Sequence, residues 1–284
     1  MPVTTVNSAR VVLLDAHVHF HTCFDVGKFL NGAWDNFGRA AQAAGADGFC
    51  AYLLMTETAY AHWFDDLSRR ASACAEVAPG WTASPSGHPA HVRLAGPKGA
   101  ALNVISGYQI ITTERLEVLA LGCVERIPDG APMRHTIDAA RALGAIPVVP
   151  WGFGKWLGRR GEHVRSLLES PGTGELFFGD NSNRLSGLPE PPILRRAKAA
   201  GFHVLPGTDP LPFPREAGRV GALGFSLECE AATEDPDSWS VIREKIGYCE
   251  AVRPFGSLEG PWAFARNQIA MQLHKRSGAL ERAA

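Results

Sequence analysis

The chain has 284 residues, which is enough for one large α/β barrel or two smaller domains, and its formal net charge is -1 at pH 7. This near-neutral balance predicts that neither nucleic acid nor a membrane surface is a partner. No apolar run approaches the roughly 18 residues of a membrane span, and the first ten residues lack the order of a signal peptide. The six cysteines form no C-x-x-C pair, so we expect reduced thiols in a cytoplasmic protein.

The first predicted strand carries most of the chemical information. The apolar run Val11 to Leu14 leads into Asp15, and His17, His19 and His21 follow at alternate positions. Alternate side chains of a strand point to one face, so the three imidazoles lie together. Neutral imidazole is a common metal ligand, and this spacing allows two of them to bind one ion. The alternative is a strand whose histidines hydrogen-bond to neighbours or face solvent.

Helical and strand-like segments alternate through the first half of the chain. A helix from Gly32 to Ala44 is ended by Gly45, and an apolar strand follows from about Gly48 to Leu54. The segment from Pro79 to Gly99 is rich in Gly, Pro, Ser and His, so we expect a loop in which His88 and His91 are exposed. The remaining predicted elements are a helix from Glu57 to Val77, strands from Leu102 to Ile105, Tyr108 to Ile111 and Leu116 to Leu121, and a hairpin turn at Thr112 to Arg115.

The second half repeats a helix-then-strand order. This order favours a parallel sheet with helical crossovers, and the total length suits a closed barrel in one domain, residues 1–284, with closing helices at about 236–277. Helices are predicted at Thr136 to Leu143, Glu162 to Glu169, Pro192 to Ala200, Asp237 to Tyr248 and Pro261 to Arg276, and strands at Ala145 to Pro150, Glu175 to Phe178 and Phe202 to Leu205.

Polar side chains follow several of these strands. Barrel enzymes carry their chemistry where strands end and loops begin, so we expect these side chains to converge. They are His17, His19, His21, Thr56, Glu57, Gln109, Trp151, Asp180, Asn181, Thr208 and Asp209. The sequence has no P-loop, no Rossmann glycine fingerprint and no G-x-S-x-G elbow, so no motif favours a nucleotide cofactor or a serine nucleophile.

The opening motif resembles that of the PHP (polymerase and histidinol phosphatase) family of metal-dependent phosphoesterases. The family's D-x-H-x-H, followed six residues later by Asp, is similar to Asp15, His17, His19 and Asp25. The resemblance spans roughly residues 11 to 225 and implies a distorted TIM-like (β/α)7 barrel of the PHP type; amidohydrolase barrels are more distantly similar. Further matching segments are Gly107 to Gln109, Leu116 to Leu121, Gly144 to Trp151 and Gly207 to Leu211.

Several ligand positions of the family are changed in this chain. Gln109 stands where the family has Glu, Trp151 and Leu211 stand where it has His, and Glu57 lies in Thr-Glu-Thr where it has T-D-H. Several divalent ions packed closely together need anionic bridges, and a neutral Gln109 does not provide one. We therefore expect one divalent ion, zinc, manganese or iron, held by His17, His19 and Asp209, with water in an open position.

The resemblance implies hydrolysis of a phosphoester or amide-like bond in a small-molecule substrate. Glu57, Asp25 or Asp209 would accept the proton from a metal-bound water. The alternative function is a catalytically inactive barrel that acts as a binding or scaffold protein, and the sequence gives no indication of oligomeric state. The predicted substrate-binding residues are Gln109, Trp151, Asp180, Asn181, Arg184 and Lys155.

Each of these residues also has a structural interpretation. Asp209 can cap its own Pro-rich turn, and Asp180, Asn181 and Arg184 can belong to an ordinary turn. Lys155 suits a solvated basic loop, and Trp151 suits the core.

Overall fold

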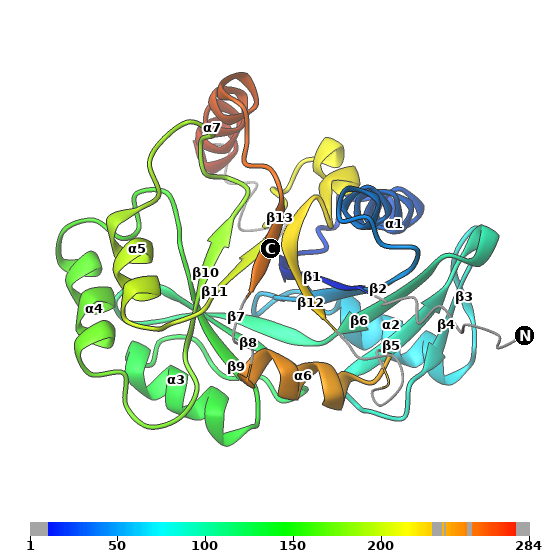
Figure 1. Ribbon diagram of the computed structural model, residues 1–284, viewed down its shortest axis with the longest axis horizontal. Coiled ribbons are helices and arrows are strands. Elements are labelled where there is room, and N and C mark those ends of the chain that lie inside the picture. Colours follow the sequence, from blue (N-terminus) through cyan, green and yellow to red (C-terminus); the bar gives the residue numbers. More distant parts are fainter. Residues whose placement is uncertain (1–10, 229–234, 236, 249–251, 277–284) are drawn as a thin grey trace, which may run out of the picture.

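The computed structural model describes residues 11–228, 235, 237–248 and 252–276 (Figure 1). Their strands form two sheets, so the fold is mixed α/β. The first sheet has the order β13-β12-β1-β2-β6-β5-β4-β3, with β1 Val11–Val18, β2 Phe49–Met55, β3 Glu76–Ala78, β4 Trp81–Pro85, β5 His91–Ala95, β6 Ala101–Ile105, β12 Leu223–Glu228 and β13 Arg253–Gly256. The second has the order β11-β10-β9-β8-β7, with β7 Gly107–Ile111, β8 Glu117–Leu121, β9 Ile146–Pro150, β10 Phe177–Asn181 and β11 Val204–Gly207.

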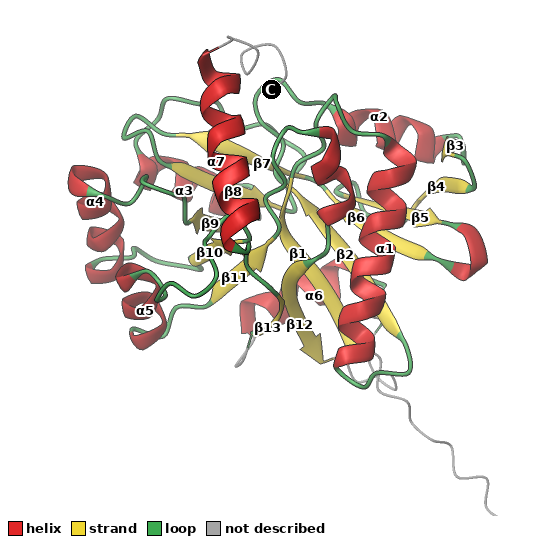
Figure 2. Cartoon of the chain, turned by 90° about the horizontal axis from the view of Figure 1, so that it is seen from above, coloured by secondary structure: helices red, strands yellow, loops and turns green. Residues whose placement is uncertain are grey.

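Helices cover the outer faces of both sheets. α1 lies across one face of β1 and β2, while α3, α4 and α5 gather around the second sheet (Figures 1 and 2). α6 and α7 lie at opposite ends of the molecule in Figure 1. The helices are α1 Val26–Ala43, α2 Trp63–Ser72, α3 Met133–Ala142, α4 Gly158–Glu169, α5 Pro192–Ala199, α6 Trp239–Tyr248 and α7 Pro261–Arg276, with 3-10 turns η1 Pro97–Gly99 and η2 Pro214–Arg219.

The two sheets approach each other without closing into the expected barrel. Within the described residues they are joined by a bridge between Glu57 and Tyr108 and by the Asp209 N–H, which donates to the His17 carbonyl at 2.7 Å. The reason lies in β1, because antiparallel β12 pairs with its first half from Val11 to Leu14. β11 therefore meets β1 only beyond that pairing, where the histidines lie. The prediction of a closed (β/α)7 barrel is not confirmed.

The longest segment whose structure differs from the prediction runs from Pro79 to Gly99. It was expected to be a loop, but β4 and β5 form an antiparallel pair inside it. The alternating side chains Trp81, Ala83, Val92 and Leu94 are buried in a core shared with α1 and α2. The alternation of buried and exposed residues along these strands was not recognised in the sequence, because the many Gly, Pro and Ser residues favour turns. His91 was expected to be exposed, and it is buried.

Helix boundaries were predicted less accurately than strands. α1 begins at Val26, six residues before the predicted start, because the Asp25 carboxylate accepts a hydrogen bond from the Lys28 N–H and caps the helix. α2 begins only at Trp63, because Glu57 continues the strand pairing. The hairpin of β7 and β8 and the strands β2, β6 and β9 are confirmed, whereas β12 and β13 were not predicted.

An apolar interior separates the two sheets. Leu14, Leu119, Val148 and Leu205 contribute to it from four strands, and α6 closes it with Trp239 among others. Within the described residues no helix has the length and apolarity of a membrane span. Cys23, Cys74 and Cys123 are free thiols, in agreement with the expectation for these three residues.

Candidate metal centre

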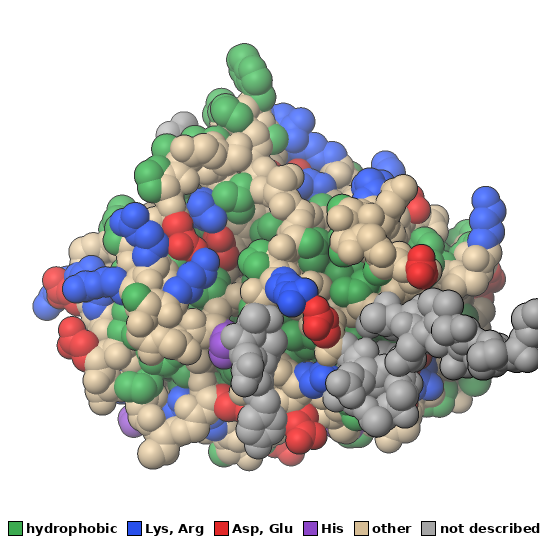
Figure 3. Space-filling view, in the orientation of Figure 1, with side chains coloured by type: hydrophobic (Ala, Val, Ile, Leu, Met, Phe, Trp, Pro, Cys, Tyr) green, Lys and Arg blue, Asp and Glu red, His purple; other side chains and the backbone are tan. Residues whose placement is uncertain are grey.

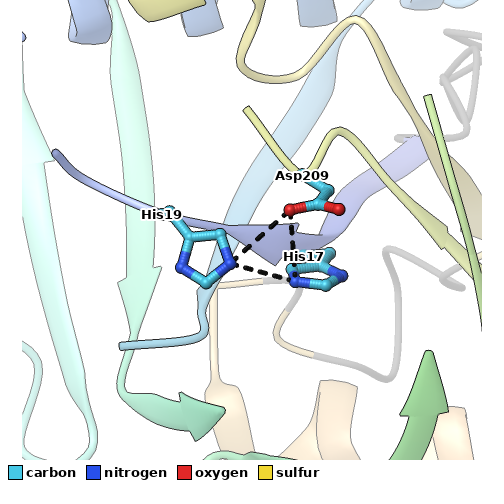
Figure 4. A group of neighbouring side chains, drawn as sticks. All are labelled: His17, His19 and Asp209. Atoms are coloured by element: carbon cyan, nitrogen blue, oxygen red, sulfur yellow. Dashed lines mark hydrogen bonds and ion pairs between the residues drawn. The ribbon is translucent and has the colours of Figure 1, made fainter. Parts of the chain in front are cut away.

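Three side chains predicted as metal ligands converge where the two sheets meet. The Nε2 atoms of His17 and His19 lie 3.1 Å apart, and each lies 3.6 Å from Oδ1 of Asp209 (Figure 4). Among the described residues these three form the group of His, Cys, Asp and Glu side chains whose ligand atoms all lie within 4.8 Å of one another. His17 and His19 are buried, and Asp209 is partly exposed. The arrangement therefore presents two nitrogens and one carboxylate oxygen to a single point.

Backbone geometry brings the two ligand-bearing strands together. A Cβ on Gly207 would lie 2.3 Å from the His17 backbone nitrogen, so only glycine permits this close approach. Asp209 then takes a left-handed conformation, with φ of 49°, and its N–H bonds to His17. This conformation is unfavourable for a residue other than glycine, and it turns the carboxylate toward the two imidazoles.

Hydrogen bonds to the Asp15 carboxylate link the same two strands. Its Oδ1 accepts hydrogen bonds from the backbone N–H groups of Thr208 at 2.7 Å and His17 at 3.2 Å. Its Oδ2 accepts from the Gly221 N–H at 2.9 Å and from the Thr208 hydroxyl. Burial raises the pKa of Asp15 to about 6, although these bonds lower it in part. Asp15 is thus a positioning group for the segments that carry His17 and Asp209.

The electrostatics of the cluster suit cation binding. Burial, followed by the neighbouring His17, lowers the pKa of His19 to about 3, so its imidazole is neutral near pH 7. Burial alone would raise the pKa of Asp209, but His17, His19 and the Lys155 ammonium together hold it below its usual value. A neutral imidazole and an ionised carboxylate are the protonation states that ligate metal.

Two asparagines hold the second oxygen of Asp209. Oδ2 accepts hydrogen bonds from Nδ2 of Asn181 at 2.8 Å and from Nδ2 of Asn183 at 3.2 Å. Asn181 also donates to the Trp151 carbonyl at 2.9 Å. The Oδ1 atoms of both asparagines are buried and have no hydrogen-bond partner in the described part of the chain. Asn183 was missed from the sequence, and its spacing of two residues from Asn181 on a strand end was the available signal.

A second chain of polar side chains reaches the cluster from β7, β8 and the segment after β9. Gln109 Oε1 lies 3.2 Å from Nε2 of His17, and its amide donates to Glu117 at 3.4 Å. Glu117 in turn forms an ion pair with Lys155. Gln109 and Lys155 were predicted as substrate-binding residues, and the structure places both beside the metal centre. Glu117 was missed, although it was a charged residue at the edge of an apolar strand.

The other predicted site residues lie apart from the three ligands. Glu57 accepts from the Phe64 N–H at 2.7 Å and pairs with Arg126 at 3.3 Å. Asp25 is exposed and caps α1. Arg184 and Asp180 pair with each other through two hydrogen bonds of 3.1 and 2.8 Å.

The last two side chains of the predicted site are Trp151 and His21. The Trp151 side chain is partly buried and packs against the core beneath α4 and α5. His21 lies beside His19, with ring centroids 5.6 Å apart, and its Nε2 lies 2.9 Å from the Pro210 carbonyl oxygen. Burial lowers the pKa of His21.

Known proteins resemble this chain in fold alone. No protein-family model and no curated sequence matches it, so the resemblance to the PHP family has no such confirmation. The structure of PsfC from Pseudomonas syringae PB-5123 matches with a TM-score of 0.53 at 14% identity, covering 94% of this chain and 99% of PsfC. A complex of Endonuclease Q with a 27-mer duplex matches with a TM-score of 0.51 at 12% identity, covering 86% of this chain. The chain spans 58% of the length of that Endonuclease Q chain.

This last similarity corrects one prediction. The near-neutral net charge led to the expectation that nucleic acid is not a partner, and Endonuclease Q contradicts it, because that structure contains a duplex with an abasic lesion at the active site. Net charge sums over the whole surface, whereas phosphate contacts depend on local donors and basic side chains. A charge of -1 therefore does not exclude nucleic acid for a chain of this fold.

Proposed function

We propose that the chain is a metal-dependent hydrolase that binds one divalent ion through His17, His19 and Asp209. The observation that carries this proposal is the convergence of two Nε2 atoms and Oδ1 within 3.1 to 3.6 Å of one another. Two ligand atoms bound tetrahedrally at about 2.0 to 2.1 Å from a zinc ion lie roughly 3.3 Å apart. The three donors are spaced for one such ion. A polynuclear site would need further anionic ligands, and the neutral Gln109 occupies the nearest position.

The unsatisfied asparagine oxygens support a ligand in the same place. A buried amide oxygen without a hydrogen-bond partner is uncommon in folded proteins and indicates a missing donor. Asn181 and Asn183 provide two such oxygens beside Asp209. We propose that they accept hydrogen bonds from bound water or substrate while their amide groups fix Asp209 Oδ2.

The proposed mechanism assigns separate tasks to the side chains. A bound divalent ion supplies Lewis acidity and a nucleophilic water near neutral pH. Asp209 is the proposed proton acceptor, because its carboxylate is the one of the three candidates that lies beside His17 and His19, at 3.6 Å from both. Glu57 instead bonds to Phe64 and Arg126, and Asp25 caps α1. Gln109 orients the substrate, and the Lys155 ammonium contacts an electron-rich oxygen of the scissile group.

The substrate class follows as part of the proposal. Phosphoesters suit the proposed ion and Lys155. The phosphodiester of a lesion-containing duplex belongs in the set, because the structure of Endonuclease Q, which is similar in fold, contains a duplex substrate with an abasic lesion at its active site. We further propose a single PHP-like domain with a distorted barrel architecture and a cytoplasmic location.

The decisive experiment measures metal content and hydrolysis together. Protein purified without a histidine tag is analysed for zinc, manganese and iron, and is assayed with bis-p-nitrophenyl phosphate, p-nitrophenyl phosphate, an anilide and an abasic duplex. We expect about one equivalent of metal and hydrolysis of at least one probe, with both lost in His17→Ala/His19→Ala. The control His163→Ala removes an exposed imidazole on α4 and should change neither quantity.

The competing function is an inactive barrel that binds a ligand. Trp151, Gln109 and Leu211 would then occupy positions that ligate metal in the PHP family. Absence of metal after incubation with excess ions, together with no hydrolysis of any probe, would favour that function and end the hydrolase proposal.

A further inference from the structure

A second polar site lies on the outer face of β10 and β11. A cleft of about 690 Å³ opens there, bounded by α5 on one side and by β12 and β13 on the other. Asp180 and Val204 line it, whereas their neighbours Asn181 and Leu205 face the metal centre and the interior. Because successive side chains of a strand point to opposite faces, the cleft is separated from the metal centre by one layer of strands.

The lining combines apolar walls with a polar end. Phe202, Val204, Pro206, Leu223 and Phe255 supply the walls. The polar end holds two ion pairs, Arg184 with Asp180 at 2.8 Å and Lys198 with Glu190 at 2.6 Å. Figure 3 shows the corresponding basic and acidic side chains gathered over α5 and the adjoining strands. The volume lies in the range of about 300 to 1,000 Å³ typical of small-molecule sites.

Hydrogen-bond donors outnumber acceptors at this end. A guanidinium has five N–H groups and an ammonium has three. Arg184 gives two side-chain bonds to Asp180, and Lys198 gives one to Glu190, so most of their donors are available to a ligand. Asp180 already accepts at both oxygens, from Arg184 and from the Asn181 N–H. This surplus favours a ligand that brings acceptor oxygens.

We infer that the cleft is a binding site for an organic anion with an apolar body. The apolar part contacts Phe202, Leu223 and Phe255, and the anionic group accepts hydrogen bonds from Arg184 and Lys198. The ligand class is set by the donor surplus and by the walls, and it does not depend on the identity of the metal.

The position of the cleft also links it to the metal centre. One five-residue segment serves both sites, because Asp180 and Arg184 line the cleft while Asn181 and Asn183 hold Asp209 Oδ2. An anion that pairs with Arg184 competes with Asp180 and shifts this segment. Binding in the cleft should therefore weaken metal binding, and by linkage the metal should weaken anion binding by the same factor.

The binding test uses 8-anilinonaphthalene-1-sulfonate, an organic anion with an apolar body, followed by its fluorescence. The full chain should bind the dye with a saturable 1:1 isotherm. Lys198→Glu reverses a charge at the cleft and should weaken binding by at least tenfold. Arg195→Glu makes the same charge change on an exposed position of α5 that does not line the cleft, and should stay within twofold of the wild type.

Each outcome decides the proposal. Equal affinity of wild type and Lys198→Glu, or equal weakening by both variants, would overturn it, because the dye would then bind elsewhere or respond only to net charge. Circular dichroism checks the fold of each variant, and Lys198→Gln replaces Lys198→Glu if the reversed charge prevents folding.

The linkage test rests on the proposed metal site and repeats a zinc titration with and without saturating dye. We expect the zinc Kd to rise at least threefold when dye is bound. An unchanged Kd would refute the linkage alone. Failure of the metal site would instead appear as absent zinc binding without dye, so the two failures are distinguishable.

Discussion

Two buried polar clusters lie side by side in this molecule, and they solve the problem of burying charge differently. In one, the Asp209 oxygen faces two imidazoles at 3.6 Å. In the other, the buried carboxylates of Glu216 and Glu259 both face the guanidinium of Arg219, and Asn267 donates to Glu259 at 2.6 Å. Arg215 also lies 3.5 Å from Glu216, so two guanidiniums face two carboxylates and the second cluster balances its own charges within the protein. The first brings together two imidazoles and a carboxylate, which could hold a metal ion.

A single segment contacts both clusters. Asn181 and Asn183 hold Asp209, while the hydroxyl of Ser182 between them accepts from Arg219 at 3.0 Å and donates to the Thr208 carbonyl at 2.5 Å. Successive residues of this segment therefore contact different clusters. The proposed function assigns ligand chemistry to the first cluster and leaves the second to stabilise the fold, and this division can be tested.

The largest effect is expected from Arg219→Met. The change removes the guanidinium that the buried carboxylates of Glu216 and Glu259 share and leaves only Arg215, 3.5 Å from Glu216, which should lower the free energy of unfolding by about 3 to 5 kcal/mol in urea denaturation. Arg69→Met, which removes an exposed ion pair with Asp66, is the control and should cost less than about 1 kcal/mol. If Arg219→Met lost zinc binding and kept its stability, the Arg219 cluster would serve ligand binding rather than the fold, and the division of roles would be wrong.

A third buried imidazole sharpens the comparison. His91 Nε2 lies 2.8 Å from the Asn103 amide oxygen, and burial lowers its pKa to about 4. The unfolded chain, with a pKa near 6.5, binds the proton more tightly, so His91 contributes stability above pH 6.5 that is lost as pH falls toward 4. The difference between these two pKa values corresponds to about 3 kcal/mol of stability.

The pH dependence is measured by urea denaturation at pH 7 and pH 4. His91→Gln should remove the part of the loss that His91 contributes, about 3 kcal/mol, while the buried imidazoles of His19 and His21 keep their own contributions. His163→Gln, at an exposed imidazole, should retain the wild-type pH dependence. Zinc should leave the His91 contribution unchanged, because no carboxylate and second imidazole converge on it in the described residues. An identical pH dependence in wild type and His91→Gln would contradict the assignment.

Substitution of a proposed metal ligand should change the zinc affinity more than the free energy of unfolding. Asp209→Asn keeps the size of the side chain and removes its charge, so zinc affinity should fall by about 100-fold or more. The free energy of unfolding without zinc should change by less than about 1 kcal/mol. Zinc at 100 times the wild-type Kd should stabilise the wild type by about 2.7 kcal/mol and the variant far less. Equal stabilisation of both proteins by zinc would place the metal elsewhere, and Asp138→Asn on α3 controls for the charge change.

The sequence predicted the convergence of His17, His19 and Asp209 better than the architecture around them. The alternating histidines of β1 reveal a shared face on their own, because strand geometry is local. Asp209 followed from its place after an apolar strand. The closed barrel could not be tested in the same way, because it depends on whether β12 or β11 takes the free edge of β1, and edge competition is a property of the whole sheet.

Contacts between distant segments were the main source of error. Glu57 was predicted to act on a proton, but its role in capping the start of α2 at Phe64 depends on where that helix begins. The convergence of Asn183 and Glu117 on the centre depends on the turn after β10 and on the register of β8 with β7. The sequence shows both residues beside predicted strands, but it does not show which distant side chain each of them contacts.

The smallest effect, and the most specific, is expected from Asn183→Ala. The variant removes one of two hydrogen bonds to Asp209 Oδ2 and leaves the ligand itself in place, so zinc affinity should fall by about tenfold. Asn181→Ala should have a similar effect, because each amide makes one further hydrogen bond, Asn181 to the Trp151 carbonyl at 2.9 Å and Asn183 to the Asp209 carbonyl at 2.8 Å. Asn183→Asp adds a second carboxylate beside Asp209 and should shift the pH dependence of zinc binding, a change that loss of packing alone does not produce. If both alanine variants bind zinc as the wild type does, the asparagines only support the turn, and Asp209 is held by its backbone conformation.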